Sequence, residues 1–260
     1  MVQGIDHIVI AVRDLATASA DYAAAGFTVT PGGEHAGGAT HNALISFGDG
    51  AYFELIAFKN PDQPQEHRWW SLLAKGEGLV DFALLSDDLA RESARLSAAG
   101  LSASLRDGGR LRPDGQRIAW RSFSLESTPP ARLPFVIEDV TARNLRVPDG
   151  AATSHPLGVT GVAGVVVAVS DLAQSAPAFA TLLDNDGTET SPSIDGAAAA
   201  RRFPLGTQWI ELVQPTSGSA LAQHISTRGD GPYEIVLTGT GAPTTLPNSA
   251  THGARIRVQG

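Results

Sequence analysis

The sequence of 260 residues contains no cysteine. This absence excludes disulfide scaffolds, thiolate zinc sites, iron–sulfur clusters and thiol nucleophiles, so any metal ion must be held by imidazole and carboxylate groups. Charged residues are also sparse, at 18% of the chain, whereas hydrophobic residues make up 42%. Because a disordered chain would carry more charge, this composition predicts a packed globular core.

Basic side chains and long apolar runs are in short supply as well. The chain has 19 Lys and Arg residues against 27 Asp and Glu residues, a formal net charge of -8. Nucleic-acid affinity depends on clustered Lys and Arg, so nucleic acid is not an expected partner. No apolar run approaches the roughly 20 residues that cross a bilayer, and no basic region followed by an apolar stretch opens the chain. We therefore expect a soluble, cytoplasmic protein without a membrane partner.

The chain contains an internal repeat. Three segments run from a glycine through apolar, β-branched residues to an aspartate followed by Leu-Ala, namely 4–14, 78–88 and 161–171. The apolar part predicts a strand. Asp14, Asp88 and Asp171 predict helix N-caps, because a carboxylate there accepts the orphan amide hydrogens of the first turn.

Each repeat extends into a larger unit. Three short strand-like segments follow the first helix, at 27–30, 42–47 and 51–58, which predicts strand, helix, strand, strand, strand over residues 4–58. The pattern recurs over 78–140 and 161–214. A fourth start at Gly231 has too few residues after it and predicts a truncated copy.

The units are expected to pair, because a single four-stranded sheet cannot bury its exposed face alone. Residues 1–150 would then form one half with two units. Residues 151–260 would form a second half with one full unit and the truncated one. The alternative, repeated βα elements of a doubly wound sheet, does not suit three strands in a row after each helix.

Polar residues interrupt the first strands of the units. Three residues after each glycine stand His7, Asp81, Gly164 and Glu234. A lone polar residue in an apolar strand is costly to bury unless it is paired or ligated. If the first strand lies beside the last strand of its unit, His7 and Glu54 share a face. Such a pair suits a divalent ion with open positions, such as iron(II), manganese, nickel or zinc, although a buried, hydrogen-bonded histidine is the alternative.

Six segments are similar to one known superfamily, namely 6–12, 37–45, 53–56, 112–115 with Trp120, 133–135 and 155–161. They resemble the glyoxalase-like proteins of the vicinal oxygen chelate superfamily. The resemblance covers most of the chain and is strongest over 4–140. It implies an α+β fold in which tandem βαβββ units pair into cupped mixed β-sheets with helices outside.

The resemblance also implies a metal site. The superfamily places one ligand on the first strand and one on the fourth strand of each of two units. Carried over to this chain, His7 and Glu54 take the first-unit positions and Asp81 takes the first-strand position of the second unit. The remaining position falls on Val136, which cannot ligate, so Glu138 is the substitute on that strand.

The metal assignment has alternatives within the sequence. Asp81 could instead pair with an arginine such as Arg112 or Arg121. In the third unit Gly164 replaces the histidine and leaves Glu211, so we expect a structural copy there.

His41 is a candidate base or substrate contact. If the turn at Asp49-Gly50 has two residues, Ile45 pairs with Glu54, and His41 then shares a face with Glu54. Four residues along a strand span roughly 13 Å, which is too far for a common metal site. His41 would therefore lie at the rim, or would be a histidine satisfied by Asn42 and the loop backbone.

Other side chains are candidate substrate contacts. Beside His41 they are Trp69, on a short helix that could close the cup, and Arg112, Trp120 and Arg121. Arg112 begins a turn between strands, and its guanidinium could reach a substrate carboxylate. The remaining histidines are expected in loops, namely His35, His67, His155, His224 and His252.

Two functions remain open. The first is a metal-dependent isomerase or lyase that acts on a small substrate with adjacent oxygens through an enolate-like intermediate, with Glu54 and His41 as catalytic groups. The alternative is a metal-free protein of the same fold that sequesters a small ligand, or that catalyses cyclisation or isomerisation. A monomer and a homodimer both fit the number of units.

Overall fold

The computed structural model describes residues 1–260, and its first half contains two units of the same design. The first unit comprises β1 (Val2–Val12), α1 (Leu15–Ala24), β2 (Thr30–His35), β3 (Thr40–Ser46) and β4 (Tyr52–Phe58). The second comprises β5 (Gly78–Ser86), α3 (Leu89–Ala98), β6 (Ser102–Leu111), β7 (Arg117–Glu126) and β8 (Phe135–Asp139). The short helix α2 (Trp70–Leu73) lies between them, and α4 (Arg143–Arg146) and a 3-10 turn (Gly150–Thr153) follow.

The second half repeats the design once in full and once in part. The full unit comprises β9 (Val159–Ala168), α5 (Leu172–Leu183), β10 (Thr188–Thr190), β11 (Ala197–Leu205) and β12 (Gln208–Pro215). After α6 (Ala220–Arg228) come β13 (Gly231–Gly239), β14 (Thr244–Thr245) and β15 (Ile256–Gln259). No helix follows β13, and the last unit contains these three strands.

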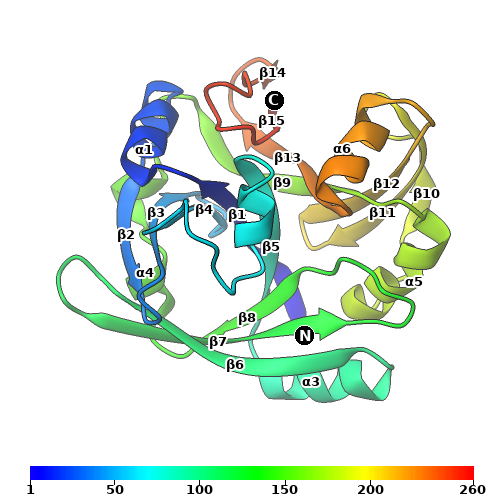
Figure 1. The fold of residues 1–260 in the computed structure, drawn as a ribbon, viewed down its shortest axis with the longest axis horizontal. Helices are drawn as coiled ribbons and strands as arrows, with labels where there is room; N and C mark the ends of the chain where they lie inside the picture. The colour runs from blue at the N-terminus through cyan, green and yellow to red at the C-terminus, as the bar shows by residue number, and fades with distance from the viewer.

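The two halves close to different degrees (Figure 1). The first forms a closed barrel in the order β1-β4-β3-β2-β6-β7-β8-β5. The second forms an open sheet in the order β10-β11-β12-β9-β13-β15-β14. In both, the first strand runs parallel to the last strand of its own unit and antiparallel to the first strand of the next. The chain thus has the α+β fold of tandem βαβββ units predicted from the sequence, not a doubly wound sheet.

The predicted helix caps are confirmed. Asp14 accepts a hydrogen bond from the amide of Thr17 (2.6 Å), and Asp88 and Asp171 cap α3 and α5 in the same way. Each cap satisfies an amide that the first turn leaves without a partner.

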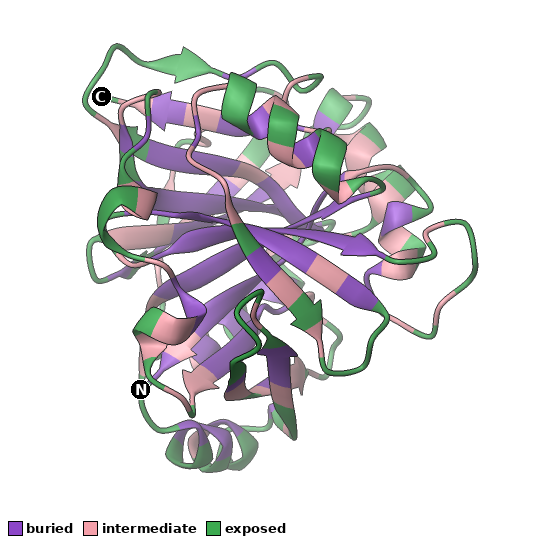
Figure 2. Cartoon of the chain, turned by 90° about the vertical axis from the view of Figure 1, so that its left-hand side faces the viewer, coloured by how far each residue is buried: buried purple, intermediate pink, exposed green.

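The main hydrophobic core lies outside the barrel, where its strands pack against the second sheet and the helices. It contains Ile8 and Ile10 of β1 together with Val165 and Val167 of β9. Alternate residues of β1 point the other way, so Val9 belongs to a smaller cluster inside the barrel. Figure 2 shows the strands largely buried while the outer faces of the helices are exposed.

Besides His224, which lies on α6 and not in a loop, two local predictions were wrong. The second strand begins at Thr30 and extends to His35, because β2 hydrogen-bonds to β3 on one side and to β6 on the other. His35 is therefore the last residue of a strand and does not lie in a loop. Close packing requires glycine here: a Cβ atom on Gly33, whose φ is +137°, would lie 2.0 Å from the carbonyl oxygen of Leu111.

The second error is the register between β3 and β4. Leu44, not Ile45, pairs with Glu54, because the connecting turn is longer than two residues and Ser46 pairs with Tyr52. A shift of one residue moves every side chain of a strand to the other face. His41 is thus on the face of β3 opposite to the one expected.

Candidate functional site

The barrel encloses a cavity of about 350 Å³, within the size range of small-molecule sites. Its lining comes from β1, β2, β3, β4, β6, β7 and β8, from α4 and from the segment that precedes α2. Acid–base groups, guanidinium groups and aromatic rings all contribute, among them His7, His35, Glu54, His67, Arg68, Trp69, Arg106, Arg110, Trp120 and Phe135.

His7 and Glu54 meet at the floor of this cavity. The Nε2 atom of His7 lies 3.6 Å from Oε2 of Glu54, while Nδ1 of the same ring lies 2.6 Å from Oδ1 of Asp6. The parallel pairing of β1 with β4 brings them together, because Val9 is opposite Glu54 and His7 is opposite Tyr52. The His7 ring stacks on Tyr52 at a centroid distance of 4.7 Å. The imidazole thus has a carboxylate on each side and a fixed orientation.

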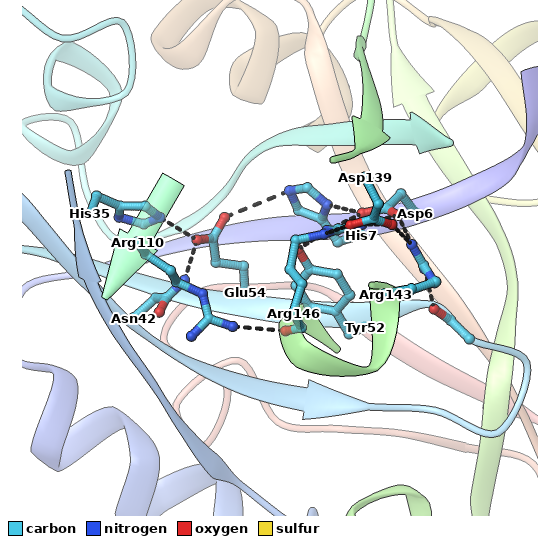
Figure 3. Close-up of polar contacts among 11 residues, drawn as sticks. Asp6, His7, His35, Asn42, Tyr52, Glu54, Arg110, Asp139, Arg143 and Arg146 are labelled. Atoms are coloured by element: carbon cyan, nitrogen blue, oxygen red, sulfur yellow. Dashed lines mark hydrogen bonds and ion pairs between the residues drawn. The ribbon is translucent and has the colours of Figure 1, made fainter. Parts of the chain in front are cut away.

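Glu54 is held by a second histidine and an amide. Its Oε1 atom accepts a hydrogen bond from Nδ2 of Asn42 (2.6 Å) and lies 3.3 Å from Nε2 of His35. Burial alone raises the pKa of Glu54, but the hydrogen bond and charge of His35, the charge of His7 and the bond from Asn42 outweigh it and lower this pKa to about 2. Glu54 is therefore ionised at neutral pH. Figure 3 shows Glu54 between the two histidines.

A network of arginines supports Asp6 behind His7. Arg146 donates to both oxygens of Asp6 (2.9 Å each), and Arg143 donates to Oδ2 of Asp6 (2.6 Å). Both arginines also bind Asp139. Burial raises the pKa of Asp6, yet Arg146 and His7 hold it well below its usual value. Asp6 is consequently an ionised acceptor for Nδ1 of His7.

Asp81 lies on the neighbouring strand β5 but is bound elsewhere. Its Oδ2 atom accepts a hydrogen bond from the Trp69 indole (3.0 Å) and forms an ion pair with Nη2 of Arg68 (2.8 Å). The partner of Asp81 is thus an arginine other than the two that the sequence suggested.

These placements bear on the expected metal site. In residues 1–260, no group of three or more His, Cys, Asp or Glu side chains is arranged to hold a metal ion. His7 and Glu54 offer two donors, and the carboxylate of Asp81 is taken up by Arg68 and Trp69. The expected donor set of His7, Glu54 and Asp81 is not assembled in this arrangement, so the residues do not fit a metal ion.

The fourth strand of the second unit adds only apolar groups to the cavity. Phe135 and Ile137 of β8 line it. Val136 lies in the core outside the barrel, and Glu138 binds Arg121 (2.9 Å) and the amide of Leu89. Glu138 therefore faces away from the cavity and does not substitute as a ligand.

The candidate substrate contacts divide into two groups. Trp69 and Trp120 line the cavity, whereas Arg112 and Arg121 do not. Arg112 binds the carbonyl of Leu145 and the carboxylate of Asp114. His41 lies with α1 in a separate groove outside the barrel, as the register of β3 requires.

Sequence reasoning missed several cavity residues. His35, Arg68, Arg110 and Arg146 come from β2, a loop, β6 and α4, and only closure of the barrel brings them together. Strand alternation alone would not have placed His35 in the barrel, because the register of β2 against β3 shifts between Pro31 and Gly33.

The barrel and its cavity define the class of protein, which is the vicinal oxygen chelate fold. The family model described as a glyoxalase-like domain matches residues 5–183. The chain therefore belongs to this glyoxalase-like family of the vicinal oxygen chelate superfamily. No curated protein matches the sequence. None of the helices combines the length and the apolar character that a membrane span needs.

Solved structures share the fold. A hypothetical protein from Staphylococcus aureus is 13% identical, with 98% of each chain covered and a TM-score of 0.74. A mutant of 4-hydroxymandelate synthase from Streptomyces coelicolor is 14% identical, with 96% of this chain and 78% of that chain covered and a TM-score of 0.61. At this level of identity the likeness concerns the fold alone.

Proposed function

We propose that the barrel cavity is the active site of a small-molecule isomerase or lyase, in which His7 moves a proton on a substrate with two adjacent oxygens. The observation that carries the proposal is the position of the His7 ring. Its Nδ1 atom is bound to Asp6, and its Nε2 atom faces Glu54 across the cavity floor. An imidazole held by a carboxylate is a common general base, because the carboxylate stabilises the imidazolium that forms.

His7 suits the role of proton carrier better than Glu54 does. A general base works best when its pKa is near the working pH, and the pKa of Glu54 is about 2. Glu54 remains ionised and stabilises a positive charge on His7 instead. This assigns Glu54 a supporting electrostatic role. His41 lies outside the barrel and has no catalytic role in this proposal.

The chemistry follows from the groups on the cavity floor. Nε2 of His7 removes a proton from the carbon that bears one of the two substrate oxygens. The electron pair of the broken C–H bond forms a double bond to the neighbouring carbonyl carbon, and the carbonyl electron pair moves onto its oxygen. Burial raises the pKa of Tyr52, so its hydroxyl stays neutral. It accepts a hydrogen bond from Arg146 and can donate a hydrogen bond to the enolate oxygen. An isomer forms when the proton returns from His7 to the adjacent carbon and the hydroxyl proton of the first carbon passes to the oxygen of the adjacent carbon, which leaves a carbonyl group on the first carbon. Loss of a leaving group together with its electron pair gives a lyase product instead.

Deuterium exchange tests the proposal without knowledge of the full reaction. Small 2-hydroxy aldehydes, 2-hydroxy ketones and 2-oxo acids are incubated with the protein in deuterium oxide, and loss of the carbon-bound proton is followed by NMR. We expect exchange with at least one compound, and a loss of about 10²–10⁴-fold in His7→Gln, the usual contribution of a general base. His224→Gln, on α6 and outside the cavity, is the matched control.

Chelation separates the two forms of the chemistry. Exchange that survives dialysis against a chelator supports proton transfer by His7 alone. Exchange that is lost on dialysis and restored by a divalent ion would instead support the metal-dependent form predicted from the sequence. Tight ligand binding without any exchange would favour sequestration and would contradict the catalytic role of His7.

A further inference from the structure

The mouth of the cavity holds more positive charge than the protein neutralises. Arg106 lines the cavity from β6 and is exposed, and its side chain makes no hydrogen bond or ion pair with any other residue of the chain. Arg68 lines it from the segment before α2 and is bound to Asp81 and to the hydroxyl of Ser124 (3.2 Å). Arg132 lies 3.9 Å from the same carboxylate. Two guanidinium groups thus lie within 4 Å of one buried carboxylate, and Arg106 adds a third positive charge to the cavity lining without an acidic partner.

The pKa of Arg68 reflects this excess of positive charge. Burial lowers the pKa of Arg68, Asp81 raises it, and the charges of Arg132 and Arg106 lower it again. Asp107, next to Arg106 on β6, also contributes to the cavity lining. Strand alternation places its side chain on the face opposite to that of Arg106 and Arg110, however, and it forms no ion pair with Arg106 or Arg68. An anion at the mouth would relieve the repulsion between Arg68 and Arg106.

Aromatic rings also line the mouth of the cavity beside Arg68 and Arg106. Arg68 lies over the rings of Trp69 (5.1 Å) and Phe135 (4.9 Å). On the opposite wall, Trp120 occupies the space beside Gly108, where a Cβ atom would lie 2.1 Å from its Nε1 atom. Gly108 therefore leaves room for the indole between Arg106 and Arg110 on the inner face of β6. Flat apolar walls beside a cationic group favour a ligand with an apolar, planar body and an anionic end.

We propose that Arg106 and Arg68 form an anion subsite that binds the carboxylate of a small, planar substrate and directs the rest of the molecule toward His7. A guanidinium group can bind a carboxylate through two parallel hydrogen bonds. Arg106 has all its donors free for this purpose, whereas Arg68 supplies charge and a stacking surface. The inference rests on the proposed function, since it names the substrate class of the same cavity.

Equilibrium binding tests the subsite without turnover. Benzoate and benzamide have the same shape and differ in charge, and their affinities for the protein are measured by calorimetry. We expect wild type to bind benzoate at least about tenfold more tightly than benzamide, the effect of one hydrogen bond to a charged group. Arg106→Gln should remove this preference. Arg117→Gln, an exposed arginine on the neighbouring strand β7 outside the cavity, should keep it.

The two proposals fail in different ways. If wild type binds neither compound or does not distinguish them, or if Arg106→Gln keeps the preference, the anion subsite is wrong whatever deuterium exchange shows. If benzoate binds as expected but no compound exchanges its proton, the subsite stands and the catalytic role of His7 is wrong. Because Arg106 is exposed and unpaired, the variant is expected to fold normally.

Discussion

The two halves of the molecule share one framework and fill it differently. His7 pairs with Tyr52 across β1 and β4, and Gly164 pairs with Trp209 across β9 and β12. Two residues further on, Val9 pairs with Glu54 as Val166 pairs with Glu211. The register is the same, so Gly164, Trp209 and Glu211 are the counterparts of His7, Tyr52 and Glu54.

In the second half, the polar side chain at the position of Glu54 has its partners within the same half. Glu211 binds Arg202 (2.8 Å) and the amide of Ser193, and Arg202 in turn stacks on Trp209. A Cβ atom on Gly164 would lie 2.3 Å from the Trp209 ring, so the indole takes the space that an imidazole would need. The second half therefore contains an ion pair without an acid–base group beside it. A shared fold does not imply a shared site.

The two halves also differ at Asp81 on β5 and at its counterpart Glu234 on β13. Asp81 pairs with Val9 across β5, and Glu234 pairs with Val166 across β13. Asp81 binds Arg68 and the Trp69 indole at the edge of the cavity, whereas Glu234 binds Arg257 of the neighbouring strand β15 (3.0 Å). Only the first half combines its carboxylates with histidines around a cavity.

The largest expected difference between the halves concerns their buried carboxylates. Asp6→Asn leaves Arg146, whose side chain is 3% exposed, without its main partner, and should lower the free energy of unfolding by about 3–5 kcal/mol. Glu211→Gln should cost less, because the Arg202 side chain is 37% exposed and can turn to water. Urea unfolding measures both. An equal or larger cost for Glu211→Gln would contradict this view of the two networks.

The next effect is a pH dependence specific to Glu54. Its pKa falls from 4.5 to about 2 on folding, so its ionised form stabilises the protein above pH 4.5, and this contribution is lost as the pH falls toward 2. The shift corresponds to about 3 kcal/mol. The difference in unfolding free energy between wild type and Glu54→Gln should therefore shrink by this amount between pH 4.5 and pH 2. A difference that is independent of pH would show that His35 and His7 do not hold the carboxylate.

The smallest expected effect concerns Gly164, the counterpart of His7 in the second half. Gly164→Ala should lower the free energy of unfolding by about 1–3 kcal/mol, because the added methyl group meets the Trp209 ring. Gly241→Ala is the matched control, since nothing lies within 4 Å of a Cβ atom there. If both substitutions have the same effect, the Trp209 ring does not fill the space that His7 occupies in the other half.

Local signals explain what the sequence could predict. The repeat, the N-caps at Asp14, Asp88 and Asp171 and the strands of the first unit other than β2 depend on neighbouring residues, and these are present in the structure. The proximity of His7 and Glu54 followed from one parallel pairing between strands of the same unit.

Long-range closure explains what the sequence could not predict. Arg68, Arg106 and His35 reach the cavity only because β2 pairs with β6 and the segment before α2 lies across the mouth of the barrel. The position of His41 depended on a register that one extra turn residue changes. Neither feature is encoded by periodicity within a single strand.

The most direct test of the central claim compares Glu54→Gln with Glu211→Gln, two substitutions at the same position of the repeated framework. Proton exchange of the substrate in deuterium oxide is measured for both variants, after urea unfolding has shown that each is folded. We expect Glu54→Gln to slow exchange strongly, because Glu54 stabilises the charged form of His7, and Glu211→Gln to match wild type. Equal rates in the two variants would contradict the assignment of the active site to the first half.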